Sequence, residues 1–557
     1  WIPDGARAFC GFYVSGSDAA LTNKATMVVM MRDGQRTVLS MQNSYEGPPE
    51  NFAMVVPVPI VLAEENVRTL PRDVFTQIDR LTAPRLVEYW EQDPCNPHAR
   101  LYGDELRSMA GVVADVEMEE SDDEDLGVTV EARFAVGEYD IVILGASDSS
   151  GLDTWLRRNG YRIPRGAEPV LRPYVRAGMK FFVARVDVRR VTFEGNRAML
   201  SPLRFHYDAE TFSLPVRLGL LNSSGHQDLI VHILSRTSRY EAANYENYAM
   251  PTNLEVNESV RASFPTFYAA LFDRMTALHP RAVFTEYAWT ALDGASACDP
   301  CPPEGPPPPE SFMTLGGDVI GVDQPGGSEL DPRLVPMKTM EGFEYVVTRL
   351  HVRYRRDTLG DDLVLREAPP IVGGREQAGP NGQGNEQGAR LAPDRNSYYQ
   401  ARYIIRHPWT GPVECASPQR GIWGGPPGTG QPVGVQPGQN LAFAPRGRAN
   451  LASFLTTPVA QATSDSVAPR LPGGPLLDTP PVTGPSWTPE QGSASPAPRG
   501  SGCASCTVGG GAMGASGLLV AGVVLGLIAR RRRKSGAGPA GGTASPGAFR
   551  GRRARPR

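Results

Sequence analysis

The chain has 557 residues, with 60 glycines and 52 prolines that gather toward its C-terminal half, where a packed core could hardly form. Its 56 basic and 60 acidic residues leave a formal net charge of −4, which excludes the basic surface typical of proteins that bind nucleic acid. Roughly the first 300 residues are therefore expected to carry the main folded part of the protein.

The N-terminal region begins with two apolar segments that flank a tight turn. Residues 25–31 and 37–41 are apolar, and Asp33 and Gly34 between them supply the positive φ angles that a hairpin turn needs. Residues 52–58 form another apolar run, whose prolines lack a backbone donor. We therefore predict a β-hairpin, followed by a short strand whose prolines favour a strand end or a sheet edge.

The hydrophobic period then changes to that of a helix. Val74, Ile78 and Leu81 recur at helical spacing and predict one helix. Pro84 fits the first turn of a second helix, which extends to Trp90. Both helices are expected to cap the sheet.

Most of the remaining elements are predicted as strands because apolar and polar residues alternate along them. Strands are expected at 128–136, 139–144, 180–188, 198–205, 214–221, 228–234, 282–289, 349–355 and 399–405, and helices at 150–156 and 264–278. The predicted fold class is α+β: a mainly antiparallel β-sheet ectodomain with a few packing helices, a disordered Pro/Gly-rich tether and one C-terminal transmembrane helix.

Composition predicts how these elements are grouped along the chain. The expected parts are a β-rich ectodomain core (1–298), a Pro/Gly-rich insertion (299–340), strands that complete the ectodomain (341–425, with a disordered insertion at 373–395), a disordered tether (426–502), a transmembrane or sorting segment (503–534) and a basic tail (535–557).

The C-terminal segment has the features of a membrane anchor. Residues 508–529 carry no charge, and about 20 residues are needed to span a bilayer as a helix. The basic run 530–534 follows directly, which by the positive-inside tendency leaves the large domain outside. The chain begins at Trp1 without an apolar leader, as a chain does once a signal peptide has been removed. We expect an exported protein of the cell envelope, anchored in or displayed on a membrane.

The cysteines suggest structural disulfides. Five lie in the ectodomain, which allows two disulfides and one thiol with the pairing left open: Cys10, Cys95, Cys298, Cys301 and Cys415. Cys298 and Cys301 form a CxxC motif, which is compatible with a redox pair, half a zinc site or a structural thiol or disulfide. The prolines that follow oppose the helix start of a redox site, and no second ligand pair stands at zinc spacing. The structural interpretation is therefore favoured.

One predicted strand has a strongly cationic face. Its arginines are Arg349, Arg353 and Arg355, with Arg356 directly after them. Such a face could bind an anionic polysaccharide or a phosphate-bearing lipid, or it could be an exposed face paired with nearby carboxylates. The histidines His226 and His232 flank another strand and would share one face, which leaves a metal or acid–base role open.

No motif for nucleophilic or metal-assisted hydrolysis is found, so the sequence identifies no catalytic residue, metal ligand or cofactor.

Near the C-terminus, Cys503, Cys506, the small-residue apolar stretch and the arginine cluster resemble the myxobacterial C-terminal sorting domain (MYXO-CTERM). The resemblance implies surface sorting with cleavage near the cysteines, so Cys503 or Cys506 would be the processing or lipid-attachment residue. This chain continues beyond the basic run, where that family usually ends. A plain transmembrane anchor is the alternative.

Four further segments, at 8–12, 52–59, 155–161 and 348–354, together resemble an uncharacterised bacterial family, the domain of unknown function twenty-three thirty. This resemblance covers residues 1 to about 425. It implies secretion and an N-terminal cysteine that corresponds to Cys10, and it implies no activity or cofactor.

Together these features predict a surface-displayed envelope protein with a binding or structural role. Its expected partners are the membrane, through the C-terminal helix, and other envelope proteins or anionic surface glycans; no nucleic acid is expected. Two alternatives remain. One is a secreted hydrolase whose site is built from scattered residues such as His206, His226 or His232, and the other is a protein that uses its odd thiol.

Overall fold

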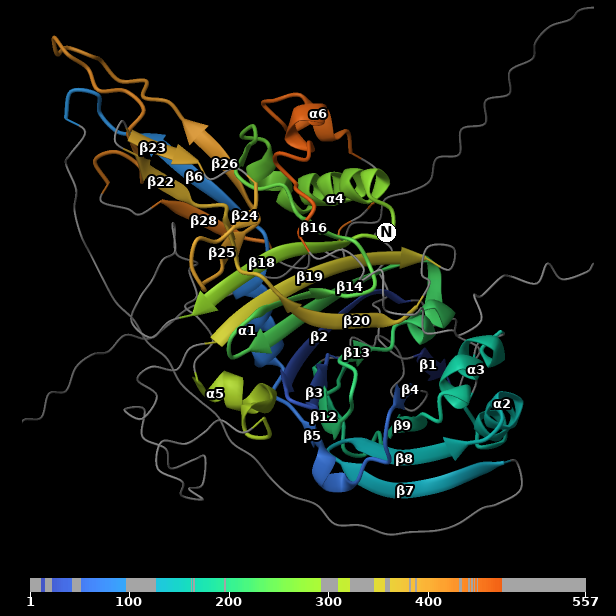
Figure 1. The fold of residues 1–557 in the computed structure, drawn as a ribbon. Helices are drawn as coiled ribbons and strands as arrows, with labels where there is room; N and C mark the ends of the chain where they lie inside the picture. Colours follow the sequence, from blue (N-terminus) through green and yellow to red (C-terminus); the bar gives the residue numbers. More distant parts are fainter. Residues whose placement is uncertain are drawn as a thin grey trace, which may run out of the picture. The chain divides into compact units, whose positions relative to one another are not determined.

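The computed structural model describes residues 12–15, 23–42, 52–96, 127–291, 309–320, 345–355 and 361–472, with short gaps at 162, 164–165, 195–196, 380–381, 386–387, 430–432, 439–440, 442–443, 445 and 448. All of these residues belong to one compact unit, Trp1–Thr488, whose elements are labelled in Figure 1. A second unit, Pro489–Arg557, lies outside the described residues.

A large mixed sheet forms the centre of this unit. The strands in spatial order are β24 (Arg390–Leu391), β21 (Ile371–Gly373), β25 (Tyr398–Gln400), β18 (Val283–Ala291), β19 (Tyr345–Arg355), β14 (Ser223–Ser235), β2 (Asn23–Asp33), β3 (Arg36–Met41), β12 (Leu203–Asp208) and β5 (Val67–Thr69), and β16 (Asn247–Ala249) also pairs with β18. Most pairs are antiparallel, but β14 runs parallel to β2. The predicted hairpin is confirmed as β2 and β3, with Asp33 opposite Arg36 and Gly34 at a φ of 54°.

A second sheet packs against one face of the central sheet. Its order is β1 (Phe12–Ser15), β4 (Phe52–Val58), β9 (Lys180–Val186), β8 (Tyr139–Ala146) and β7 (Val128–Val136). Met54 and Phe182 from this sheet meet Phe205 and Leu229 from the central sheet in one apolar core. Helices α2 (Ser149–Arg158) and α3 (Glu168–Arg176) cover the other face of the second sheet.

The opposite face of the central sheet is covered by helices and by a third sheet. Helix α1 (Asp73–Thr82) packs against part of it, and α4 (Val260–Leu278) packs beside β18 and β19 (Figure 1). The third sheet has the order β17 (Leu254–Glu255), β26 (Arg402–His407), β6 (Arg85–Glu91) and β27 (Trp423–Gly424), and β28 (Gly434–Pro437) also pairs with β6. Helix α4 is therefore enclosed between two sheets.

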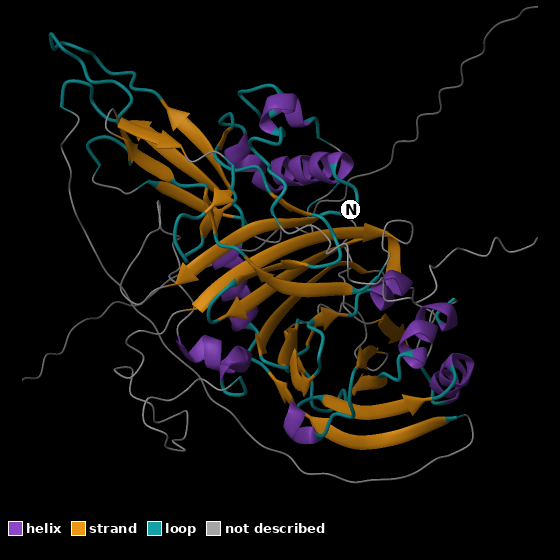
Figure 2. Cartoon of the chain, in the orientation of Figure 1, coloured by secondary structure: helices purple, strands orange, loops and turns teal. Residues whose placement is uncertain are grey.

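The remaining elements are short. They are the helices α5 (Pro309–Phe312) and α6 (Val459–Ala462), the short helices η2 (Glu64–Asn66), η3 (Arg217–Asn222), η4 (Met313–Gly317) and η8 (Leu451–Ser453), and the strands β10 (Thr192–Glu194), β11 (Arg197–Met199), β13 (Ser213–Leu214), β15 (Arg239–Ala242), β20 (Leu363–Ala368), β22 (Glu376–Gly379) and β23 (Gly382–Asn385). Strands dominate the described fold (Figure 2), which confirms the α+β class with mostly sheet and few helices.

Two predicted elements were wrong. The second helix, placed from Pro84 to Trp90, is strand β6, which pairs with β26 and β28 and has only buried or partly buried residues on both faces. A strand covered on both faces has no clean alternation to reveal it, so its apolar residues fell at helical spacing by chance. The strand predicted at 214–221 is mostly the short helix η3, because Pro215 interrupts the run.

Part of the predicted tether is folded. We call the described residues between 441 and 471 the C-terminal strap. Its apolar side chains pack against α4 in the core beneath the third sheet: Leu441, Leu451, Leu455, Ala462, Val467 and Ala468. The disorder predicted for this part of 426–502 was therefore wrong, because a few separated apolar residues suffice when α4 already offers an apolar surface. The predicted disordered insertion at 373–395 likewise contains β22, β23 and β24.

Over the residues that the structure describes, no helix has the length and apolarity needed to cross a membrane. The predicted span at 508–529 lies outside those residues.

Candidate functional site

The predicted cationic strand, β19, lies in the middle of the central sheet. Its side chains alternate between the two faces, so Leu350 and Val352 enter the apolar core while Arg349 and His351 face α1 and α4. The charged face carries a set of ionised groups that we call the buried cluster: Asp79, Asp228, Asp273, Glu286, Arg349, His351, Arg353 and Arg446. Five elements and the strap contribute to it.

Sheet register brings these groups together. On β14, Asp228 lies opposite Arg353. On β18, the register shifts between Thr285 and Tyr287, so Glu286 is the extra residue of a bulge. A bulge re-aims a side chain, and here it lets Glu286 contact both Arg349 and His351.

His351 lies between two carboxylates. Its Nδ1 is 2.5 Å from Oε1 of Glu286, and its Nε2 is 3.0 Å from Oδ1 of Asp228. Because a carboxylate accepts hydrogen bonds and does not donate them, both contacts are satisfied only when both ring nitrogens carry a proton. Burial opposes that charge, but Glu286 and Asp228 outweigh it and raise the pKa of His351 above its ordinary value. The ring also stacks on Phe272, with 3.7 Å between centroids.

Arg349 neutralises the innermost carboxylates. Its Nε donates to Oε2 of Glu286 at 2.6 Å, and its Nη1 donates to Oδ1 of Asp79 at 2.6 Å. Glu286 is fully buried, and burial alone would raise its pKa, but His351 and Arg349 together lower that pKa to about 2. The neighbouring His232 differs from His351, because burial and then the charge of Arg349 push the pKa of His232 well below its ordinary value. His232 is therefore neutral.

The outer part of the cluster contacts the strap. Arg353 donates from Nε to Oδ1 of Asp228 at 2.9 Å and also bonds Asp273 of α4. From the strap, Arg446 donates to Oδ2 of Asp228 at 2.7 Å, and the backbone amide of Gly447 donates to Oδ2 of Asp273 at 3.0 Å. The strap thus closes the cluster on its outer side.

The cluster balances its own charge. Four carboxylates face three guanidinium groups and one imidazolium, and the side chains of Glu286, His351, Asp228 and Arg349 are at most 2% exposed. A cavity of about 10 Å³ with room for a single water molecule lies beside Val352, Arg353 and Tyr354, and no other member of the cluster lines it. In the described ranges, no three His, Cys, Asp or Glu side chains are arranged to hold a metal ion. The cluster can hold a proton on His351. Its carboxylates are already paired with arginine and histidine side chains of the chain itself.

The predicted cationic face is not one exposed surface. Arg349 is buried and Arg353 is nearly so, because α4 and the strap cover them, and both are paired with carboxylates. Arg355 is exposed at the end of β19, and Arg356 lies outside the described residues. Anion binding by this end of the strand stays a prediction.

The histidines do not form a common site. His206 on β12 contacts Asn66, with its Nε2 3.1 Å from the amide nitrogen, while His232 on β14 contacts Thr82. Strands β2 and β3 separate β12 from β14, which is about 14 Å across a sheet. His226 is exposed at the start of the same strand as the buried His232.

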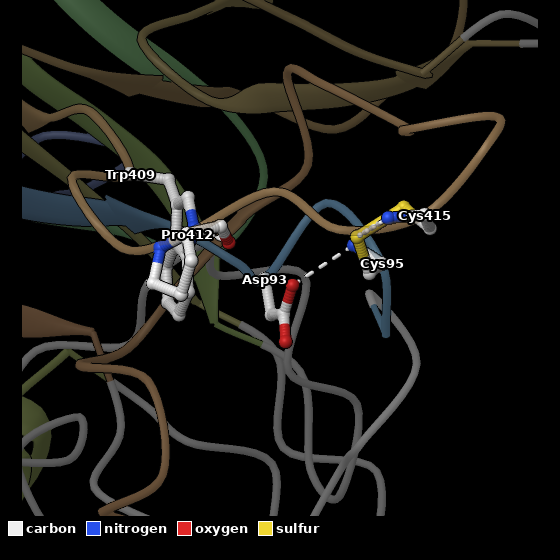
Figure 3. Close-up of a disulfide and its surroundings, with 5 residues drawn as sticks. All are labelled: Asp93, Cys95, Trp409, Pro412 and Cys415. Carbon is white, nitrogen blue, oxygen red and sulfur yellow. Dashed lines mark hydrogen bonds between the residues drawn. A yellow bond between two sulfur atoms is a disulfide. The ribbon is translucent and has the colours of Figure 1, made fainter.

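One disulfide is present. Cys95 and Cys415 are bonded, with 5.5 Å between their Cα atoms and 320 positions between them in sequence. Figure 3 shows the bond beside Asp93, whose carboxylate accepts the backbone amide of Cys95 at 2.9 Å. The two cysteines follow the neighbouring parallel strands β6 and β26, so the bond joins the loops at one end of the third sheet. The other cysteines with predicted roles lie outside the described residues: Cys10, Cys298, Cys301, Cys503 and Cys506.

Sequence reasoning missed the acidic half of the cluster and Arg446. One signal could have found part of it. Three basic side chains alternate with apolar ones along residues 349–354, in a strand whose apolar face is core-like. A central strand of that kind is covered on both faces, so its charges require partners. Which residues supply them is set by contacts distant in sequence.

Comparison with known proteins places the chain in a family. Residues 4–366 match the family model described as "Uncharacterized protein conserved in bacteria (DUF2330)". No curated protein and no solved structure matches the chain. The matched residues include Asp79, Asp228, Asp273 and Glu286, whereas Arg446 and Cys415 lie beyond them. The chain belongs to this bacterial family, as its resemblance in sequence indicated.

Proposed function

We propose that this member of the DUF2330 family is exported and displayed at the cell surface by its C-terminal segment, where its sheet-rich domain has a binding or structural role. The observation that carries the proposal is the disulfide between Cys95 and Cys415. Disulfides form and persist in oxidising compartments and are rare in the reducing cytosol. The Cys95–Cys415 bond closes a long loop and so stabilises the fold. It can do so only in a compartment that keeps the bond oxidised.

The C-terminal sequence supports the same location. The uncharged stretch 508–529 and the basic run 530–534 have the order of an anchor whose preceding domain is outside. Cys503 and Cys506 are the proposed processing or lipid-attachment residues if the segment is a sorting signal of the MYXO-CTERM kind. The alternative remains a transmembrane helix that stays in place.

The buried cluster favours a binding or structural role over catalysis. Its carboxylates, guanidinium groups and His351 are occupied by one another and are covered by α4 and the strap. A ligand would therefore meet the outer surface of the domain. The proposed partners are other envelope proteins or anionic surface glycans, which Arg355 at the exposed end of β19 could contact.

The test is the intact mass of the protein recovered from native envelopes, measured without reduction and after alkylation of free thiols. An exported protein should keep Cys95 and Cys415 unalkylated, and a matched Cys95→Ser variant should gain one alkyl group, on Cys415. Loss of the chain beyond the 503–506 region would support sorting, and a full-length mass would support a retained anchor. Recovery in the cytosol with both thiols alkylated would overturn the proposal.

A further inference from the structure

The strap reaches the charged face of the central sheet at the side where that face is closest to solvent. Side-chain exposure rises outward through the cluster, from 0% for Glu286 and 1% for His351 to 15% for Arg446 and 28% for Asp273. The inner groups are enclosed by sheet and helix. Displacement of the strap would therefore open the cluster to water on its outer, more exposed side.

We propose that His351 is a pH-sensitive lock on the C-terminal strap: as an imidazolium it completes the charge balance of the cluster that the strap covers, and its deprotonation favours an open strap. The lock is separate from the surface location proposed above, because it rests on contacts inside the domain: those of His351 with Asp228 and Glu286, and those that join the strap to the cluster.

Loss of the His351 proton changes two things. The cluster passes from electrical neutrality to one excess negative charge in a buried setting, which is costly. A neutral ring also has one proton for two carboxylates, so a nitrogen lone pair would face Asp228 at 3.0 Å or Glu286 at 2.5 Å. Opening of the strap relieves both problems, because water can then solvate the exposed carboxylate.

The other titratable and charged groups that face His351 come from five elements and the strap. They are Asp228 and the neutral His232 on β14, Glu286 on β18, Arg349 and Arg353 on β19, Asp273 and Tyr268 on α4, Asp79 on α1, and Arg446 on the strap. The hydroxyl of Tyr268 donates to Glu286, and burial raises its pKa well above the ordinary value, so it stays neutral. His351 is the member of the cluster whose two contacts require a proton on each ring nitrogen, and Glu286 and Asp228 raise its pKa against the effect of burial.

The direction of the effect follows from linkage. A group whose pKa is raised by folding stabilises the closed state fully below its ordinary pKa, which is 6.5 for His351. That stabilisation is lost as the pH rises from there to the folded pKa, by up to about tenfold in the opening equilibrium per pH unit.

Hydrogen exchange of the full-length, disulfide-bonded protein tests the lock. After correction for intrinsic exchange rates, amides of Gly447 and of residues 451–456 should keep constant protection below pH 6.5 and lose about tenfold per unit above it. His351→Gln should give low protection at every pH. His206→Gln, which changes a histidine on a distant strand, should keep the wild-type profile. Protection in the wild type that stays constant from pH 6 to 9 would overturn the proposal.

A second measurement covers the case in which His351→Gln does not fold. Nitrogen chemical shifts of the His351 ring in the wild-type protein report its protonation directly. Both ring nitrogens should be protonated at pH 7, where an ordinary histidine is mostly neutral. A neutral ring at pH 7 would contradict the lock.

Discussion

The two faces of the same strands differ in what makes them stable. On one face, β14 and β19 place Leu229, Val231 and Leu350 in an apolar core shared with the second sheet. On the other face, one residue along, Asp228 and Arg349 enter a cluster of paired charges. The apolar face gains free energy in proportion to the area it buries, without regard to direction. The charged face depends on every partner being present, because each unpaired charge carries its full desolvation cost.

The largest effect is expected from removal of one charge at the centre of the cluster. Glu286→Ala leaves Arg349 and His351 without their shared carboxylate, which should cost about 3–5 kcal/mol in the free energy of unfolding. Urea unfolding followed by circular dichroism measures the loss. A cost below about 1 kcal/mol would show that the charged face does not depend on every partner being present.

A deletion on the apolar face should cost slightly less. Leu350→Ala removes buried methyl groups from the neighbouring position of β19 and should lower the free energy of unfolding by about 3 kcal/mol. The same urea experiment measures it. The loss of unfolding free energy should be the same at pH 3 and pH 7, because the substitution touches no group that titrates in this range. A loss that changes with pH would show that the apolar face and the charged face are not independent.

Acid should weaken the charged face by a similar amount. The pKa of Glu286 falls from 4.5 to about 2 on folding, so its contribution is full above pH 4.5 and is lost as the pH falls toward 2. At about 1.4 kcal/mol per unit, this amounts to about 3 kcal/mol. Unfolding free energies from pH 6 to pH 2 should show the loss in the wild type. In Glu286→Gln, which cannot ionise at this position, the free energy of unfolding should fall less between pH 6 and pH 2 than it does in the wild type.

The smallest effect is expected in the outer part of the buried cluster, where the strap contacts it. Arg446→Met removes the bond from the strap to Asp228, which still keeps Arg353 and His351, so the loss should be about 1.5 kcal/mol. Arg36→Ala is a matched control, since it breaks an ion pair to Asp208 in which both side chains are more than a third exposed, and it should cost less than about 1 kcal/mol. Equal losses in the two variants would place Arg446 among ordinary surface pairs.

An element of this fold could be predicted from the sequence when the residues that determine it lie close together along the chain. The hairpin at Asp33 and Gly34 was predicted because a turn and its flanking strands are encoded together. The alternation along residues 349–355 predicted the strand and its two faces. It also suggested that the charged face was exposed, since the groups that cover it come from α1, α4, β14, β18 and the strap.

The predictions for the strap and for β6 were wrong for related reasons. In a stretch rich in proline and glycine, Leu451 and Leu455 are isolated apolar residues, and their burial depends on the surface that α4 offers. Strand β6 is defined by its neighbours β26 and β28, which lie more than 300 positions away. A short stretch of sequence shows neither the surface of α4 that buries the strap nor the strands that pair with β6.

The Cys95–Cys415 bond also determines what a protease can do to the chain. A cut anywhere in the 320 positions that the bond spans leaves both pieces covalently attached. Nicked protein would therefore migrate as one molecule without reductant and separate into fragments with it. The products of a cut between Cys95 and Cys415 are therefore visible only on reduction.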